Sequence, residues 1–182
     1  MQETAGDDWT GRTDLPVSII VSAPPGESRQ DHRHWRIMGV VAGQRFAADG
    51  VERMVIRSSP EGDLYMWRGH RIRLAPSEAE DYALNLAADV PLVYVVVRWD
   101  GERGLLPQEV TVSLGEAQQM DSTELRSVDE SVLTAPMPPE VGVWLQEFTA
   151  RHYVPRKKKK RGKRRSKAIY DAEVGDWAGD ET

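Results

Sequence analysis

A strongly basic run near the carboxyl end limits where this chain can fold. Residues 155–167 contain ten lysines or arginines and no acidic residue. Like charges at this density repel one another and keep a segment extended, so the run adds nothing to a packed core. Residues 168–182 reverse the sign, with five acidic residues and no basic one. We therefore expect residues 155–182 to form a disordered tail, basic at 155–167 and acidic at 168–182.

The rest of the chain is long enough for one folded domain. The chain has 182 residues, 40% of them hydrophobic and none of them cysteine, which excludes disulfides and thiol chemistry. Residues 1–14 are polar and acidic, so we expect a disordered leader and no signal peptide. The longest apolar run, residues 92–97, is too short to cross a bilayer. These features predict a soluble cytoplasmic protein.

Alternating apolar residues predict several strands. Residues 64–74 predict a hairpin, because apolar residues alternate on both sides of a turn at Gly69. Residues 92–99 are β-branched and apolar on both faces, which is typical of a central strand. Single strands are expected over residues 15–23, 35–41, 52–57, 92–99 and 109–112.

Capping signals predict three short helices. Ser77 with Glu80, and Ser113 with Glu116, have the spacing of a capping box. A third helix is expected between Pro138 and Pro155, with one apolar stripe. Its members are Val141, Trp144, Leu145 and Phe148. Together the patterns predict an α+β fold: a single domain over residues 15–154 with a mainly antiparallel sheet and about three short helices.

No group of residues has a pattern typical of an enzyme. His32 and His34 could share a metal ion, but a site needs a third and usually a fourth ligand, and nothing nearby in the sequence supplies an obvious one. Glu78, Glu80 and Asp81 fall in the first turn of an expected helix, where the helix dipole favours acidic residues. The chain has no nucleophile elbow, phosphate loop or dinucleotide fingerprint. We therefore expect no catalytic residue, no metal site and no cofactor.

The tryptophans allow two interpretations. Trp35, Trp67, Trp99 and Trp144 each lie in an apolar strand or on the apolar face of a helix, which is typical of core residues. Alternatively, one or two of them form an exposed patch with neighbouring arginines, a composition that protein interfaces favour. The candidate partner-binding residues are Trp35, Arg36, Trp67 and Arg98.

The basic run is a candidate site for polyanions. It would attract nucleic acid by counterion release, and acidic lipid or an acidic protein surface would be attracted in the same way. No aromatic residue interrupts the run, so a nucleic-acid contact would not depend on base sequence. The run could instead solubilise the chain or fold back onto the acidic domain. The candidate residues are Arg156, Lys157, Lys158, Lys159, Lys160, Arg161, Lys163, Arg164, Arg165 and Lys167.

Four stretches resemble a bacterial family of unknown function. They are residues 30–36, residues 77–86 with 91–98, residues 110–113 with 116–118, and residues 136–148 running on to the basic end. Members of that family tend to be encoded among the genes for a molybdenum or tungsten formate dehydrogenase and its maturation factors. The chain departs from the family at Leu114-Gly115, where a proline and an aromatic residue are expected. The resemblance implies an accessory role and supplies no catalytic residue.

Two functions of different classes follow. The first is a non-enzymatic accessory protein that binds a formate dehydrogenase subunit or maturation factor. The alternative is a nucleic-acid or ribosome-associated protein that binds through its basic tail. Residues 1–154 hold 14 arginines against 24 acidic residues, and such a domain is repelled by phosphate backbones. This charge favours the accessory function.

Overall fold

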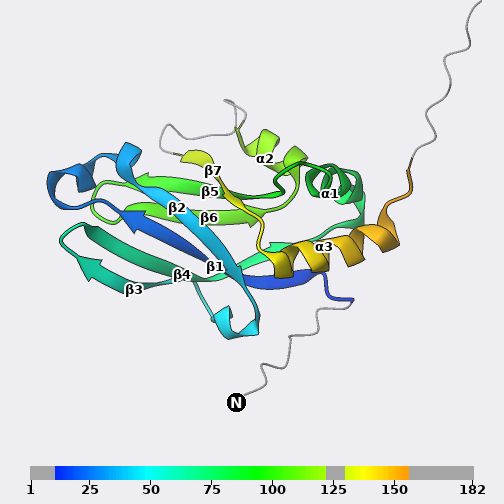
Figure 1. Cartoon of the computed structure of the whole chain (residues 1–182), viewed down its shortest axis with the longest axis horizontal. Coiled ribbons are helices and arrows are strands. Elements are labelled where there is room, and N and C mark those ends of the chain that lie inside the picture. Colours follow the sequence, from blue (N-terminus) through cyan, green and yellow to red (C-terminus); the bar gives the residue numbers. More distant parts are fainter. Residues whose placement is uncertain (1–10, 122–129, 156–182) are drawn as a thin grey trace, which may run out of the picture.

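The described part of the chain folds into two antiparallel sheets flanked by three α-helices (Figure 1). The computed structural model describes residues 11–121 and 130–155. It confirms the predicted α+β class, the antiparallel pairing and the three short helices. The predicted tail from residue 156 onward lies outside the described residues. So do the first ten residues of the predicted leader, whereas the first strand already begins at Asp14.

The first sheet has four strands in the order β2-β1-β4-β3. Strand β1 lies inside the sheet, and its alternating apolar side chains explain why. The side chains that are fully buried on one face are those of Leu15, Val17, Ile19 and Val21. The strands are β1 (Asp14–Ala23), β2 (Arg36–Ala42), β3 (Glu52–Ser59) and β4 (Gly62–Arg73).

Strand β4 is continuous, so the hairpin predicted over residues 64–74 is wrong. Gly69 has a φ of 86° and lies where the pairing of β1 with β4 shifts register. A glycine with positive φ inside a strand marks a bulge as readily as a turn. A side chain at Gly69 would also lie 2.1 Å from the carbonyl oxygen of Gly50. The actual hairpin joins β3 to β4, where Ser59 pairs with Gly62.

The second sheet has three strands in the order β6-β5-β7. They are β5 (Leu92–Asp100), β6 (Gly104–Thr111) and β7 (Glu130–Pro136). Strand β5 is central, as predicted, because β6 and β7 pair with its two edges. Its inward side chains, Val93, Val95 and Val97, are buried. Strand β7 has no counterpart among the predicted strands.

The two predicted capping boxes have different outcomes. Helix α1 (Ala79–Leu86) follows a 3-10 turn over Pro76–Glu78, and no side chain caps its first turn. Helix α2 (Leu114–Asp121) is capped, because the Glu116 amide donates to Ser113 Oγ at 3.1 Å. The Ser113 amide donates to the Thr111 hydroxyl at 3.0 Å, and that hydroxyl donates to the Glu116 carboxylate. The second box therefore closes through Thr111.

Helix α3 (Pro139–His152) packs beside α1. Its Phe148 ring meets the Tyr82 ring edge to face, with the ring centres 5.9 Å apart. Trp144 donates its indole N–H to the Arg12 carbonyl at 3.1 Å, which fixes the chain just before β1. The predicted apolar stripe of this helix is buried in full.

One hydrophobic core lies between the sheets. It combines inward side chains of β1, β4, β5 and β6 with those of α1 and α3. Strand β4 lies beside β6, and β2 lies beside β7. Strand β3 supplies no member of this core. All residues of β3 except Ser59 are exposed, so the second sheet does not cover this edge of the first sheet (Figure 1). We call this uncovered edge, with the surface beside it, the open side.

Candidate protein-docking surface

Strand β3 is an exposed edge strand with an apolar centre between charged residues. Among the described residues it pairs only with β4, so there its other edge presents free backbone amide and carbonyl groups. Three consecutive residues, Met54, Val55 and Ile56, are 46%, 61% and 46% exposed. Val51, just before the strand, is also exposed. We call Val51 and the residues of β3 the β3 edge.

Natural edge strands are usually protected from pairing with other chains, and β3 has only part of that protection. Its register shifts between Val55 and Arg57, which leaves Ile56 in a bulge. A bulge and charged residues such as Arg53 discourage uncontrolled pairing. The apolar residues remain uncovered, however, and an exposed apolar group of this kind is typical of an interaction site.

A cleft of about 300 Å³ lies beside the β3 edge, and we call it the arginine cleft. Tyr65 of β4 and Trp35 line it, and their rings stack with centres 6.2 Å apart and planes 12° apart. Gly104, at the start of β6, lies against the Trp35 ring. A Cβ at Gly104 would come within 2.2 Å of that ring. The remaining lining residues are Gly26, Arg29, Gln30, Arg53, Gly101, Glu102 and Arg103.

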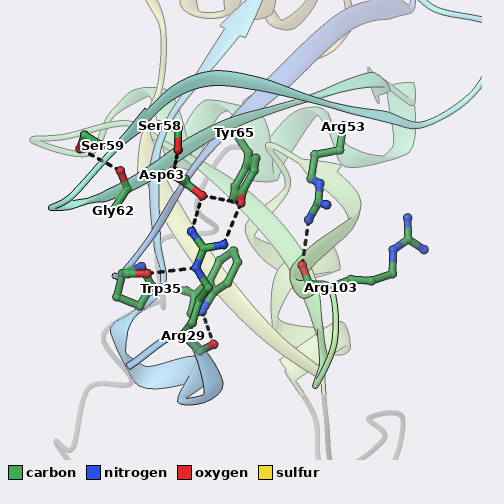
Figure 2. Close-up of polar contacts among 10 residues, drawn as sticks. Arg29, Trp35, Arg53, Ser58, Ser59, Gly62, Asp63, Tyr65 and Arg103 are labelled. Carbon is green, nitrogen blue, oxygen red and sulfur yellow. Dashed lines mark hydrogen bonds and ion pairs between the residues drawn. The ribbon is translucent and has the colours of Figure 1, made fainter. Parts of the chain in front are cut away.

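One wall of the arginine cleft is held by a network around Arg29, drawn in Figure 2. The Arg29 guanidinium pairs with the Asp63 carboxylate and donates to the Tyr65 hydroxyl at 3.2 Å. Hydrogen bonds from Ser58, Arg29 and Tyr65 together lower the pKa of Asp63 to about 2. Trp35 donates its indole N–H to the Arg29 carbonyl at 3.0 Å. Arg29 therefore supports the wall, and its charge is already compensated.

Two other arginines are less fully compensated, although Arg103 is close enough to Asp100 to help lower the pKa of that carboxyl. The Arg53 guanidinium lies over the rings of Tyr65 and Trp67, at 4.7 and 5.8 Å from their centres. It donates to the Arg103 carbonyl at 3.0 Å, which joins β3 to the turn before β6 (Figure 2). Within the described part of the chain, neither Arg53 nor Arg103 forms an ion pair. Both can therefore bind an anionic group from outside.

The predicted partner-binding residues do not form one patch. Trp35 and Trp67 are 5% and 4% exposed, so neither forms the exposed patch with arginines that was the alternative interpretation of the tryptophans. Both belong to the core, because each ring packs between the sheets, although Trp35 also lines the cleft. Arg36 and Arg98 are exposed but lie on β2 and β5, on strands of different sheets.

The polar clusters singled out in the sequence have structural roles. Ser113 is fully buried, and its hydroxyl lies 3.1 Å from the Glu78 carboxylate and 3.2 Å from that of Asp81. Asp81 also accepts from the Gly115 amide at 2.9 Å, so these contacts fasten α1 to α2. The described residues contain no group of three or more acidic or histidine side chains placed to hold a metal ion. His32 and His34 are exposed.

A second cleft, of about 400 Å³, lies between β4 and β6. Its wall includes His70, which is 5% exposed and whose Nε2 atom has no hydrogen-bond partner. Burial lowers the pKa of His70 to about 4, so the ring is neutral at neutral pH. The surrounding charges are mixed, with Arg71 and Arg73 facing Glu109 and Glu116.

The structure therefore defines a two-sheet α+β protein with an open, partly apolar side and an arginine cleft. The chain belongs to the family described as protein of unknown function DUF3305, whose model matches residues 16–162. Neither a curated protein nor a solved structure matches it. Among the helices of the described residues, none is both long and apolar enough to cross a membrane.

Proposed function

We propose that this chain is a non-enzymatic accessory protein that binds another protein through its open side. The observation that carries the proposal is the β3 edge, with three consecutive exposed apolar residues on a strand whose outer edge is unpaired in the described part of the chain. Interfaces combine a desolvated apolar centre with arginine and aromatic residues. The open side provides this combination, because the arginine cleft lies directly beside the apolar residues.

The polar residues of the fold support a role without chemistry. The carboxylates of Glu78, Asp81 and Glu116 accept hydrogen bonds from the chain itself. A general acid or base needs its proton directed at a substrate, and these groups are used to hold helices in place. The Nε2 atom of the buried His70 has no hydrogen-bond partner among the described residues, so no side chain in that part of the chain is placed to take or give a proton there.

We further propose that the partner is a subunit or maturation factor of a molybdenum or tungsten formate dehydrogenase, and that binding occurs in the cytoplasm. The support is the resemblance described above, together with membership of a family with no assigned activity. An accessory protein needs only to recognise a surface, which a rigid two-sheet scaffold with an exposed strand does well.

The alternative remains a protein that binds nucleic acid or the ribosome through its basic run. Ten basic residues within residues 155–167 favour it. The two proposals differ in which part of the chain matters. Loss of residues 155–182 should weaken capture of a protein partner, because long-range attraction is lost, without abolishing capture. The same deletion should eliminate retention on a polyanion resin and on cellular RNA if the alternative holds.

The test is affinity purification at mild salt from the native cell, followed by identification of the proteins and RNA that co-purify. We expect formate dehydrogenase subunits or maturation factors with the parent chain. The substitution Val55→Glu should reduce their recovery at least tenfold, because it places a charge in the apolar centre. Val143→Glu changes a valine of similar exposure on α3 and should leave recovery unchanged. Equal recovery with both variants would refute docking at the β3 edge.

A further inference from the structure

We propose that the β3 edge is extended by an acidic, extended segment of the partner protein, whose carboxylates enter the arginine cleft. This inference rests on the proposed function and specifies the chemistry of the partner. The added strand would pair with the free backbone groups of β3, as in other cases of strand addition to a sheet edge. The arginine cleft would then select acidic segments among all extended ones.

The register of β3 determines which side chains such a strand would meet. Arg53 pairs with Trp67, and Val55 pairs with Tyr65, and directly paired residues share one face of a sheet. Met54 pairs with Met66 on the opposite face. An added strand therefore has one row of side chains above Arg53 and the cleft, and the other row beside Met54. A segment in which acidic and apolar residues alternate would place its carboxylates over the cleft and its apolar side chains beside Met54.

The charges support this assignment. Residues 52–73 carry five arginines against three acidic residues, although residues 1–154 as a whole have an excess of acidic residues. Asp63 already compensates Arg29, whereas Arg53 and Arg103 form no ion pair in the described part of the chain. The Arg103 carbonyl holds the Arg53 side chain at the cleft. A preorganised guanidinium binds a carboxylate with two parallel hydrogen bonds.

The experiment measures binding of labelled peptides to the full-length protein by fluorescence anisotropy at 0.3 M salt. The probe is a ten-residue peptide of alternating glutamate and valine. A second peptide has the same sequence with alternate backbone amides methylated, which removes hydrogen bonds along one edge and leaves the charge unchanged. The basic run attracts both peptides equally, so their difference isolates strand pairing. We expect the methylated peptide to bind at least tenfold more weakly.

Arginine variants test the cleft. Arg53→Gln combined with Arg103→Gln should weaken binding of the unmethylated peptide at least tenfold. Arg98→Gln removes an exposed arginine from β5 and should change binding less than twofold. A peptide of alternating lysine and valine should not bind. Equal binding of the methylated and unmethylated peptides would overturn the proposal, and so would a double variant that binds as the parent does.

Two other occupants of the edge are also outcomes that overturn the proposal. If removal of residues 168–182 strengthens peptide binding tenfold, the acidic end of the chain itself occupies the cleft. If the protein sediments as a dimer that the peptide dissociates, a second copy occupies the edge. The proposed function can be tested apart from this inference. A partner whose recovery depends on Val55 but not on Arg53 and Arg103 would support docking at the β3 edge and refute recognition of an acidic segment.

Discussion

At the scale of single residues, the shape of the arginine cleft depends on Gly104. Its φ of 85° and its approach to the Trp35 ring leave no room for a side chain. We predict that Gly104→Ala lowers the free energy of unfolding by about 2–4 kcal/mol, because backbone strain and overpacking both contribute. Gly101→Ala lies in the same turn with no atom in its way and should change stability by less than about 0.5 kcal/mol. Urea denaturation of the two variants checks the prediction.

Asn85 is a buried residue that the sequence pattern did not single out. Its side-chain amide donates to the carbonyls of Leu92 and Val112 and accepts from the Leu92 amide. These bonds connect α1 to the start of β5 and the end of β6. Asn85→Leu leaves those backbone groups unpaired, and each such group costs roughly 1–3 kcal/mol.

We therefore predict that Asn85→Leu lowers the free energy of unfolding by about 2–4 kcal/mol in chemical denaturation. Leu84→Gln changes the exposed neighbour on the same helix and should have an effect below about 0.5 kcal/mol. A loss below 1 kcal/mol (roughly one net hydrogen bond) for Asn85→Leu would contradict the role assigned to this residue.

The stability of the protein should depend on His70 below neutral pH. Burial lowers its pKa from 6.5 to about 4, so the unfolded chain binds a proton that the folded chain excludes. The contribution of the neutral His70 ring to the free energy of unfolding is complete above pH 6.5 and is lost as the pH falls towards 4. The loss is on the order of 1–3 kcal/mol. Asp63, with its pKa of about 2, adds its own loss at lower pH.

Thermal denaturation between pH 7 and 4 tests this dependence. We expect a smaller decrease in stability for His70→Leu than for the parent, because the variant has no group that titrates at this position. If the melting temperatures of the two proteins fall equally between pH 7 and pH 4, His70 does not control stability in this range.

At the scale of elements, a strand can be predicted from the sequence when its own residue pattern determines where it begins and ends. The alternation of β1 and the apolar run of β5 reflect burial between two layers, so both were located to within about two residues. Strand β7 has few apolar residues of its own and exists because it pairs with β5. Gly69 fits either a turn or a bulge, and the pairing of β4 with β1, more than forty residues away in sequence, decides between them.

The candidate site was less predictable than the fold. Arg53 and Arg103 are fifty residues apart in the sequence and meet only in the folded chain, where the start of β3 lies beside the turn before β6. The three apolar residues of β3 were visible in the sequence as a weak strand, but its exposure follows from the strand order. Tryptophan next to arginine suggested an interface, whereas Trp35 and Trp67 are needed in the core.

Exposure of β3 also predicts which substitutions the fold tolerates. Val55→Glu should change the free energy of unfolding by less than about 0.5 kcal/mol, because the side chain is largely exposed. The same substitution at Val95, which is fully buried, should prevent folding because it buries an unpaired charge. Circular dichroism during urea titration distinguishes the two outcomes. An unfolded Val55→Glu chain would contradict the exposed position of β3.

At the scale of the whole molecule, two kinds of attraction would act on a partner. The basic run acts at long range and is screened by salt, so it governs how fast a partner is met. The open side acts at short range through apolar contact, strand pairing and the arginine cleft. Acidic residues outnumber arginines in residues 1–154, and this charge would repel nucleic acid, which is why we propose a protein partner.

Hydrogen exchange of the protein alone and in complex with its purified partner tests the docking surface most directly. Because β3 is an unpaired edge, its outward amides should exchange fast in the free protein and slowly in the complex. The account predicts new protection concentrated in residues 52–59 and in the turn over residues 101–104. Protection confined to α3 or to the outer face of β5, with β3 unchanged, would contradict it.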